Sequence, residues 1–234
     1  MTSPHEMPQV AVVDYGLGNL FSVRHVCEHV GLNAVITSDR REIAAADAVI
    51  LPGVGAYGDA MACLRRLDLV GPLREIALSG KPLLGVCLGQ QLLMSESYEF
   101  GRHDGLNIIP GDVVRFDNPQ GRRGPLKVPH VGWNRIAKPA GDDRRWDGSP
   151  LDQRAEGEYM YFVHSFYVRP HDPSVVLAVS KYGDVEFCAA VRRDNVVAFQ
   201  FHPERSGRAG VAVYRRFAEM VAARREAVGR SCAA

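Results

Sequence analysis

A single cysteine lies between two glycines in the stretch GVCLGQQ, residues 85–91. The apolar run before it predicts a buried strand, and the residues after it predict a helix. A strand, then G-x-C-x-G, then a helix is typical of a nucleophile elbow with cysteine in place of serine. Flanking glycines allow a sharp turn, the N–H of Leu88 points at the attacked atom, and a helix start favours the thiolate. The alternative is that Cys87 is a buried packing residue at a strand end.

A second candidate stretch is FQFHPE, residues 199–204, in which a buried strand runs into His202 and Glu204. A catalytic cysteine needs a base to carry its proton, and the base needs an acceptor that fixes its tautomer and orientation. His-x-Glu on one turn can supply both groups. The alternative is a surface histidine beside a proline.

A glycine-rich turn, Leu51 to Gly55, follows another predicted strand and can aim a backbone N–H at a developing oxyanion. An ordinary strand-to-helix loop is the alternative. A dinucleotide fingerprint is not present, because the G-x-G at 16–18 lacks the third glycine.

These stretches must be positioned by the elements that the hydrophobic pattern predicts. In the first half, strands at 10–13, 34–36, 48–51 and 81–86 alternate with helices at 19–30, 60–67, 73–78 and 88–95. Buried strands that alternate with helices indicate a parallel sheet covered on both faces. The turn after Leu51 and the turn at Cys87 then lie on the same, carboxyl edge of that sheet.

In the second half, the pattern predicts strands without long helices, at 113–116, 161–163, 175–179, 187–191 and 196–201. We interpret them as antiparallel additions. Residues 141–157 are polar and predict an exposed loop, and 211–225 predict an amphipathic helix. The fold class expected is α/β, with a central mostly parallel sheet flanked by helices, as one domain over 1–234 with a flexible tail at 1–8.

Bulk properties exclude several classes of protein. The 234 residues are 46% hydrophobic and 24% charged with a net charge of +1, so no basic surface for nucleic acid is indicated. Five widely spaced cysteines without C-x-x-C predict neither a disulfide framework nor a zinc site and fit a reducing cytoplasm. The N-terminus does not predict a secretory signal, and no apolar run is long enough to span a membrane. We expect no metal or cofactor.

In combination, PGVG, GVCLGQQ and FQFHPE resemble the triad, or class I, glutamine amidotransferases. Three further stretches, DYGLGN at 14–19, VPHVGWN at 128–134 and YFVHSF at 161–166, resemble the glutaminase subunits of imidazole glycerol phosphate synthase in histidine biosynthesis. The resemblance extends from residue 10 to about residue 225.

The resemblance implies that Cys87 attacks the side-chain amide of glutamine, that His202 shuttles the proton and that Glu204 orients His202. It implies an oxyanion hole from the N–H groups of Val54 and Leu88. The residues implied to bind the substrate are Gly55, Gln91, Glu99, Ser165 and Phe166. Glu99 would pair with the α-ammonium group, although it is also compatible with a solvated loop charge, as Gln91 is with a helix surface.

The resemblance also implies a (β/α)8-barrel cyclase partner in a heterodimer, which uses the ammonia to make imidazole glycerol phosphate and aminoimidazole carboxamide ribotide. The implied docking residues are Asn19, Trp133, Tyr161 and Arg205. Such glutaminases idle until the partner binds its ligand, and we expect a donor of the Pro52 to Gly55 loop to point away at rest. One departure is Arg205, where the family usually has lysine.

Two alternatives stay open at this stage. The chain can be the glutaminase subunit of another synthase, such as one for anthranilate or pyridoxal phosphate, although DYGLGN and PHVGWN disfavour this. It can also be a catalytically silent interaction subunit, which the complete triad disfavours. A self-sufficient thiol hydrolase is less favoured, because no second large substrate pocket is indicated.

Overall fold

The computed structural model describes residues 7–141, 144–152, 154 and 156–232. Most of the tail predicted at 1–8 therefore lies outside the described residues. The expectation of a single domain stays a prediction. Within the described part of the chain, no helix combines the length and the apolar character needed to cross a membrane.

The fold is built on a seven-stranded sheet in the order β13-β14-β15-β4-β3-β1-β2. Its parallel strands are β1 (Gln9–Val13), β2 (Asn33–Thr37), β3 (Ala48–Leu51), β4 (Leu83–Val86) and β15 (Val196–Phe199). Antiparallel strands β13 (Val176–Tyr182) and β14 (Val185–Arg193) extend one edge. The predicted fold class, a mostly parallel sheet with antiparallel additions in the second half, is confirmed. The interpretation of 196–201 as one of those additions is wrong, because β15 pairs parallel with β4. The strands predicted at 113–116 and 161–163 lie in separate small sheets.

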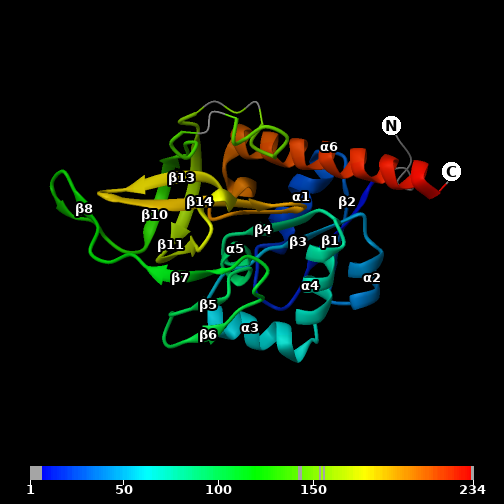
Figure 1. Cartoon of the computed structure of the whole chain (residues 1–234), viewed down its shortest axis with the longest axis horizontal. Helices are drawn as coiled ribbons and strands as arrows, with labels where there is room; N and C mark the ends of the chain where they lie inside the picture. The colour runs from blue at the N-terminus through cyan, green and yellow to red at the C-terminus, as the bar shows by residue number, and fades with distance from the viewer. Residues whose placement is uncertain (1–6, 142–143, 153, 155, 233–234) are drawn as a thin grey trace.

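Helices cover both faces of this sheet, as its fully buried strands require. Val10 and Val12 of β1 belong to one core cluster with α1 (Leu20–His29) and α6 (Gly207–Cys232). Ala11 and Val13 point to the opposite cluster, which includes side chains from α2 (Arg40–Ala45), α3 (Tyr57–Arg66) and α4 (Val70–Leu78). Figure 1 shows α6 along one side of the sheet and α3 and α4 along the other.

Residues from Glu96 onwards also form small sheets that the sequence predicted only in part. One has the order β12-β7-β5-β6, from β5 (Glu96–Ser97), β6 (His103–Asp104), β7 (Gly111–Arg115) and β12 (Phe166–Pro170). Two pairs are β10 (His130–Arg135) with β11 (Tyr159–His164), and β8 (Gln120–Gly121) with β9 (Gly124–Pro125). All strand pairs of these small sheets are antiparallel except β5 with β7. β10 and β12 were missed because, apart from His130 and Val168, their residues are half-buried or exposed and make no apolar run.

The helix that follows Cys87 is shorter than predicted. α5 spans Leu88–Leu92, although the pattern predicted a helix as far as residue 95. The carbonyls of Leu92, Leu93 and Met94 accept hydrogen bonds from the N–H groups of residues 106–109. Because this distant segment satisfies the terminal carbonyls, the chain leaves the helix and enters β5.

The segment 141–157 is not simply an exposed loop, which corrects the sequence prediction. Trp146 is only 2% exposed, and its indole N–H donates to the carbonyl of Leu177 at 2.8 Å. Leu151 is also fully buried. Two isolated apolar residues in a charged stretch carry no periodicity, so only tertiary packing identifies them as core.

Candidate active site

Cys87 occupies a strained turn between β4 and α5. Its φ is 54° and its ψ is −109°, a backbone conformation that residues other than glycine rarely adopt. The N–H of Cys87 donates to the carbonyl of Phe199 at 2.7 Å, which ties the turn to neighbouring β15. The turn therefore exposes the thiol to a cavity above the sheet while its backbone stays fixed.

The two flanking glycines are needed for close packing and not for a positive φ. A Cβ at Gly89 would lie 1.8 Å from the carbonyl oxygen of Leu51, and one at Gly85 would lie 2.8 Å from the Cβ of Ala198. Gly89 lets α5 approach β3, and Gly85 lets α5 and the side chain of Ala198 pack against β4. The backbone strain of the elbow is carried by the cysteine itself.

His202 and Glu204 follow β15 on the short turn that contains Pro203–Arg205. Nδ1 of His202 lies 2.8 Å from Oε1 of Glu204, and both side chains are buried. The N–H of His202 donates to the carbonyl of Tyr161, so the turn is also fixed to β11. Burial alone would lower the pKa of His202, but the neighbouring Cys87 sulfur and the Glu204 carboxylate outweigh it and raise that pKa to about 10.

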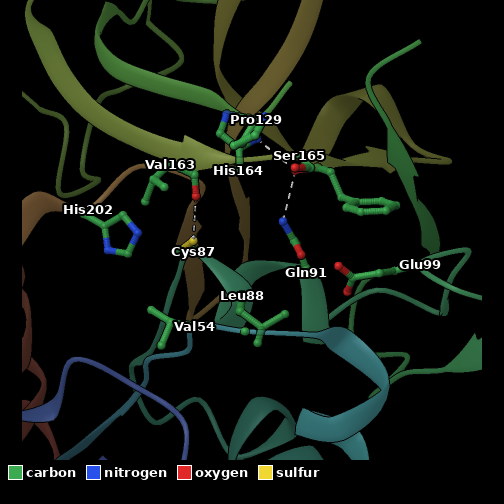
Figure 2. A pocket seen from close by; sticks show the side chains of 12 residues that line it. Val54, Cys87, Leu88, Gln91, Glu99, Pro129, Val163, His164, Ser165 and His202 are labelled. Carbon is green, nitrogen blue, oxygen red and sulfur yellow. Dashed lines mark hydrogen bonds between the residues drawn. The ribbon is translucent and has the colours of Figure 1, made fainter. Parts of the chain in front are cut away.

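The other ring nitrogen of His202, Nε2, is buried without a hydrogen-bond partner among the residues that the structure describes. Figure 2 shows the His202 ring beside Cys87 at one end of the cavity, with Gln91 and Glu99 towards the other end. The Cys87 sulfur lies 4.0 Å from the carbonyl oxygen of Val163.

The glycine-rich loop after β3 lies against the start of α5. The N–H of Leu88 donates to the carbonyl of Gly53 at 3.4 Å, while the side chain of Val54 is 41% exposed. The buried hydroxyl of Tyr15 donates to the carbonyl of Pro52 at 2.8 Å. A carbonyl, and not an open site for an oxyanion, therefore faces the Leu88 N–H in this structure.

A cavity of about 360 Å³ connects these groups (Figure 2). It is lined by Val54, Gly55, Cys87, Leu88, Gln91, Glu99, Pro129, Val163, His164, Ser165, Phe166 and His202. All of the candidate substrate and oxyanion residues are thus brought to one place. Glu204 lies behind His202. Sequence reasoning did not single out Pro129, Val163 or His164, although the last two stand in the YFVHSF stretch.

Two polar side chains at the far end of the cavity already have partners. The side-chain Nε2 of Gln91 donates to the carbonyl of Phe166 at 3.1 Å. Oε2 of Glu99 accepts from the N–H of Tyr57, the first residue of α3, at 2.6 Å. Gln91 is therefore not an exposed helix residue, and Glu99 is not a free loop charge.

His164, which lines the cavity, forms a buried pair with His130. Nδ1 of His130 lies 3.0 Å from Nε2 of His164, and Nδ1 of His164 lies 2.8 Å from the carbonyl oxygen of Phe166. Burial lowers the pKa of His130 to about 4 and that of His164 to about 3. Both rings are therefore neutral near pH 7. The two histidines are 34 residues apart, and nothing in the sequence around either one indicates that their rings are in contact.

Three of the four expected docking residues lie together on the outer face of β10 and β11. Trp133, which is 54% exposed, faces Tyr161 across the strand pair with ring centroids 6.0 Å apart. The guanidinium carbon of Arg205 lies 4.5 Å from the centroid of the Tyr161 ring. Asn19 is half-buried and immediately precedes α1.

The chain matches a known protein family and is similar in sequence to proteins of known function. The family described as glutamine amidotransferase class-I matches residues 11–220. The imidazole glycerol phosphate synthase subunit HisH of Rhodopirellula baltica is 49% identical over 89% of this chain and 96% of its own length. HisH of Syntrophotalea carbinolica is 50% identical over 90% of this chain and 100% of its own length.

Solved structures share the fold at lower identity. PurLQS from Thermotoga maritima has a TM-score of 0.67 at 21% identity and covers 91% of this chain and 98% of that chain. The glutaminase domain of Trypanosoma brucei CTPS with bound acivicin has a TM-score of 0.62 at 17% identity, over 93% of this chain and 94% of that chain. From these matches, the chain belongs to the class-I glutamine amidotransferase family and, within it, to the HisH subunits of imidazole glycerol phosphate synthase.

Proposed function

We propose that this chain hydrolyses glutamine at Cys87 and delivers the ammonia to a cyclase subunit of imidazole glycerol phosphate synthase. The observation that carries the proposal is the strained turn at Cys87, which exposes the thiol to the cavity that His202 also lines. Family membership supplies the reaction class, and the geometry supports the residue roles proposed below.

In this mechanism the Cys87 thiolate attacks the side-chain amide carbon of glutamine and forms a tetrahedral intermediate. The protonated His202 gives its proton to the leaving nitrogen, so ammonia departs and a glutamyl thioester remains. Water, deprotonated by His202, then attacks the thioester and releases glutamate and the thiolate. Glu204 stabilises the imidazolium and holds its Nδ1–H, so that Nε2 faces the sulfur.

The far end of the cavity suits the amino-acid part of glutamine. One oxygen of Glu99 is held by the Tyr57 N–H, so the other can accept from the α-ammonium group. Gln91, Gly55 and the main chain of Ser165 and Phe166 line the remaining wall. A glutamine bound in this way would direct its side-chain amide towards Cys87.

We further propose that the structure represents an idle state. The N–H groups of Val54 and Leu88 would form the oxyanion hole, but the Gly53 carbonyl engages Leu88 here. Rotation of the Gly53–Val54 peptide would withdraw that oxygen and present the Val54 N–H. The hydrogen bond from Tyr15 to Pro52 would confine the rotation to this one peptide.

The partner surface proposed is the outer face of the β10–β11 pair. Its exposed side chains are Val131, Trp133, Tyr159 and Val163. Exposed aromatic residues beside an arginine are frequent at the energetic centre of an interface. Because Val163 also lines the cavity, the face leads directly to Cys87. A (β/α)8-barrel cyclase docked there would receive the ammonia and form imidazole glycerol phosphate and aminoimidazole carboxamide ribotide.

Arg205 is proposed to act within this surface and not in the chemistry. Its guanidinium stacks on Tyr161, an arrangement that its planar shape favours over that of lysine. A cytoplasmic location is also proposed. Cys27, Cys63, Cys87 and Cys188 are free thiols, which suit a reducing compartment.

The deciding experiment measures glutamate release from glutamine by the chain alone and with the cyclase and its nucleotide ligand. Cys87→Ala is the blank. We expect strong stimulation in the complex that the substitution abolishes. Equal activity with and without the cyclase would indicate a glutaminase of another synthase. If a glutamine-analogue electrophile failed to label Cys87, the chain would be a silent interaction subunit.

A further inference from the structure

Gln200 stands in the same FQFHPE stretch as His202 but has no role in the mechanism above. It follows β15 directly and is fully buried. Its side-chain Oε1 lies 3.0 Å from Nε2 of Gln91, and its Nε2 lies 3.7 Å from the sulfur of Cys87. The amide therefore bridges a substrate-site residue and the nucleophile.

The direction of this bridge is fixed by the carbonyl of Phe166, which can only accept hydrogen bonds. The amide nitrogen of Gln91 must face that carbonyl, at 3.1 Å. The second hydrogen of the same nitrogen points at Gln200, so Gln200 must present its oxygen there. The Gln200 nitrogen is then left on the opposite side, facing the sulfur of Cys87.

The histidine pair holds the reference carbonyl in place from its other side. His164 donates from Nδ1 to the Phe166 oxygen, and its Nε2 accepts from Nδ1 of His130. The Phe166 carbonyl oxygen thus accepts hydrogen bonds from both His164 and Gln91. With donors on both sides, the carbonyl cannot turn away, and the polarity of the chain from His130 to Cys87 is set.

We propose that Gln200 is a positioning residue whose side-chain N–H donates to the Cys87 sulfur, stabilises the thiolate and directs it towards the cavity. An N–H donor favours the charged form of its acceptor, most strongly where water is excluded. The proposal rests on Cys87 being the nucleophile, as proposed above. Because Gln200 is fully buried, glutamine does not reach it, and its effect passes through its two contacts, the sulfur and Gln91. Gln91 keeps its hydrogen bond to the Phe166 carbonyl when Gln200 is substituted, so the main effect is on the sulfur.

The test compares Gln200→Met with wild type. Methionine keeps the length of the side chain but has no N–H donor. The matched control is Gln90→Met, because Gln90 is equally buried in neighbouring α5 and its amide has no hydrogen-bond partner among the described residues. Alkylation of Cys87 by iodoacetamide is followed across pH in the full chain, with peptide-resolved mass spectrometry to separate it from the other cysteines.

We expect the midpoint of Cys87 alkylation to rise by about one pH unit in Gln200→Met, which is about a tenfold loss of thiolate below the midpoint. Gln90→Met should keep the wild-type midpoint. In glutamine hydrolysis, Gln200→Met should lower kcat about tenfold while KM stays near the wild-type value. If Gln200 had a purely structural role, Gln200→Met would neither raise the alkylation midpoint nor lower kcat while leaving KM unchanged.

Gln200→Glu provides a second variant if Gln200→Met does not fold. Its carboxylate still accepts from Gln91 but repels a thiolate, so the midpoint should rise again. An unchanged midpoint in whichever variant folds, with wild-type Cys87 reactive and glutamine hydrolysed, would overturn this inference and leave the proposed function standing. A wild-type Cys87 that neither reacts nor supports hydrolysis would overturn both.

Discussion

Acid should destabilise this protein through His164, and the size of the effect follows from its burial. The pKa of His164 falls from 6.5 to about 3 because burial disfavours the charged ring. The unfolded state therefore binds a proton as the pH falls below about 6.5, whereas the folded state binds one only near pH 3. This contribution to stability is complete above the unfolded pKa and is lost as the pH falls towards the folded one.

At about pH 5 the unfolded ring is mostly charged and the folded ring is still neutral. The difference of about 1.5 pH units below the unfolded pKa corresponds to about 2 kcal/mol of lost stability, from about 1.4 kcal/mol per unit. Near pH 3 the loss would approach about 5 kcal/mol. This loss is large compared with the free energy of unfolding of many domains, which is only about 5–15 kcal/mol.

The perturbation that isolates His164 is His164→Asn. The new amide nitrogen takes about the place of Nδ1 and can still donate to the Phe166 carbonyl, but it does not titrate. We expect the variant to be less stable than wild type at about pH 7.5 by about 1–3 kcal/mol, because His130 loses its partner. At about pH 5 that gap should shrink by about 2 kcal/mol.

Equilibrium urea unfolding at both pH values measures the gap, with the fluorescence of buried Trp146 as the probe. Taking the difference between variant and wild type removes the contributions of the titrating groups that do not interact with His164. A gap that stays constant between the two pH values would refute the reasoning. It would mean that folded His164 is protonated as easily as the unfolded ring.

Three further predictions concern the proposed catalytic base, the elbow and the proposed docking face. Glu204→Gln should lower the pKa of His202 and reduce kcat for glutamine about 100-fold or more, as a pH–rate profile would reveal; an unchanged profile would contradict the role of the 2.8 Å contact. Gly89→Ala should destabilise the fold by about 3 kcal/mol or more in urea unfolding, because its Cβ would lie 1.8 Å from a backbone oxygen. The control Gly229→Ala, within α6 and in open space, should be neutral or stabilising by about 1 kcal/mol, and equal effects would refute the packing argument. Trp133→Ala should weaken binding of the cyclase by about 2 kcal/mol in a titration, while Cys87 alkylation stays normal; unchanged affinity would remove this surface from the interface.

The sequence by itself determined the features that depend on short-range pattern. Buried apolar runs such as Val10–Val13 and Ala48–Leu51 identify parallel strands because both faces of such strands are covered. The order of strand, Cys87 and helix indicated the elbow. The pattern His-x-Glu after a buried strand indicated His202 as the candidate base and Glu204 as its acceptor. Each of these signals lies within a few neighbouring residues.

Only the tertiary structure decided features that depend on residues far apart in the chain. The helix after Cys87 ends early because the N–H groups of residues 106–109 donate to its terminal carbonyls. Trp146 can be buried in the core because the carbonyl of Leu177 accepts a hydrogen bond from its indole N–H. The polarity of the Gln200 amide follows from the Phe166 carbonyl, and no local pattern encodes that link. A hydrogen bond has a direction only once both partners are placed, and that placement comes from the fold.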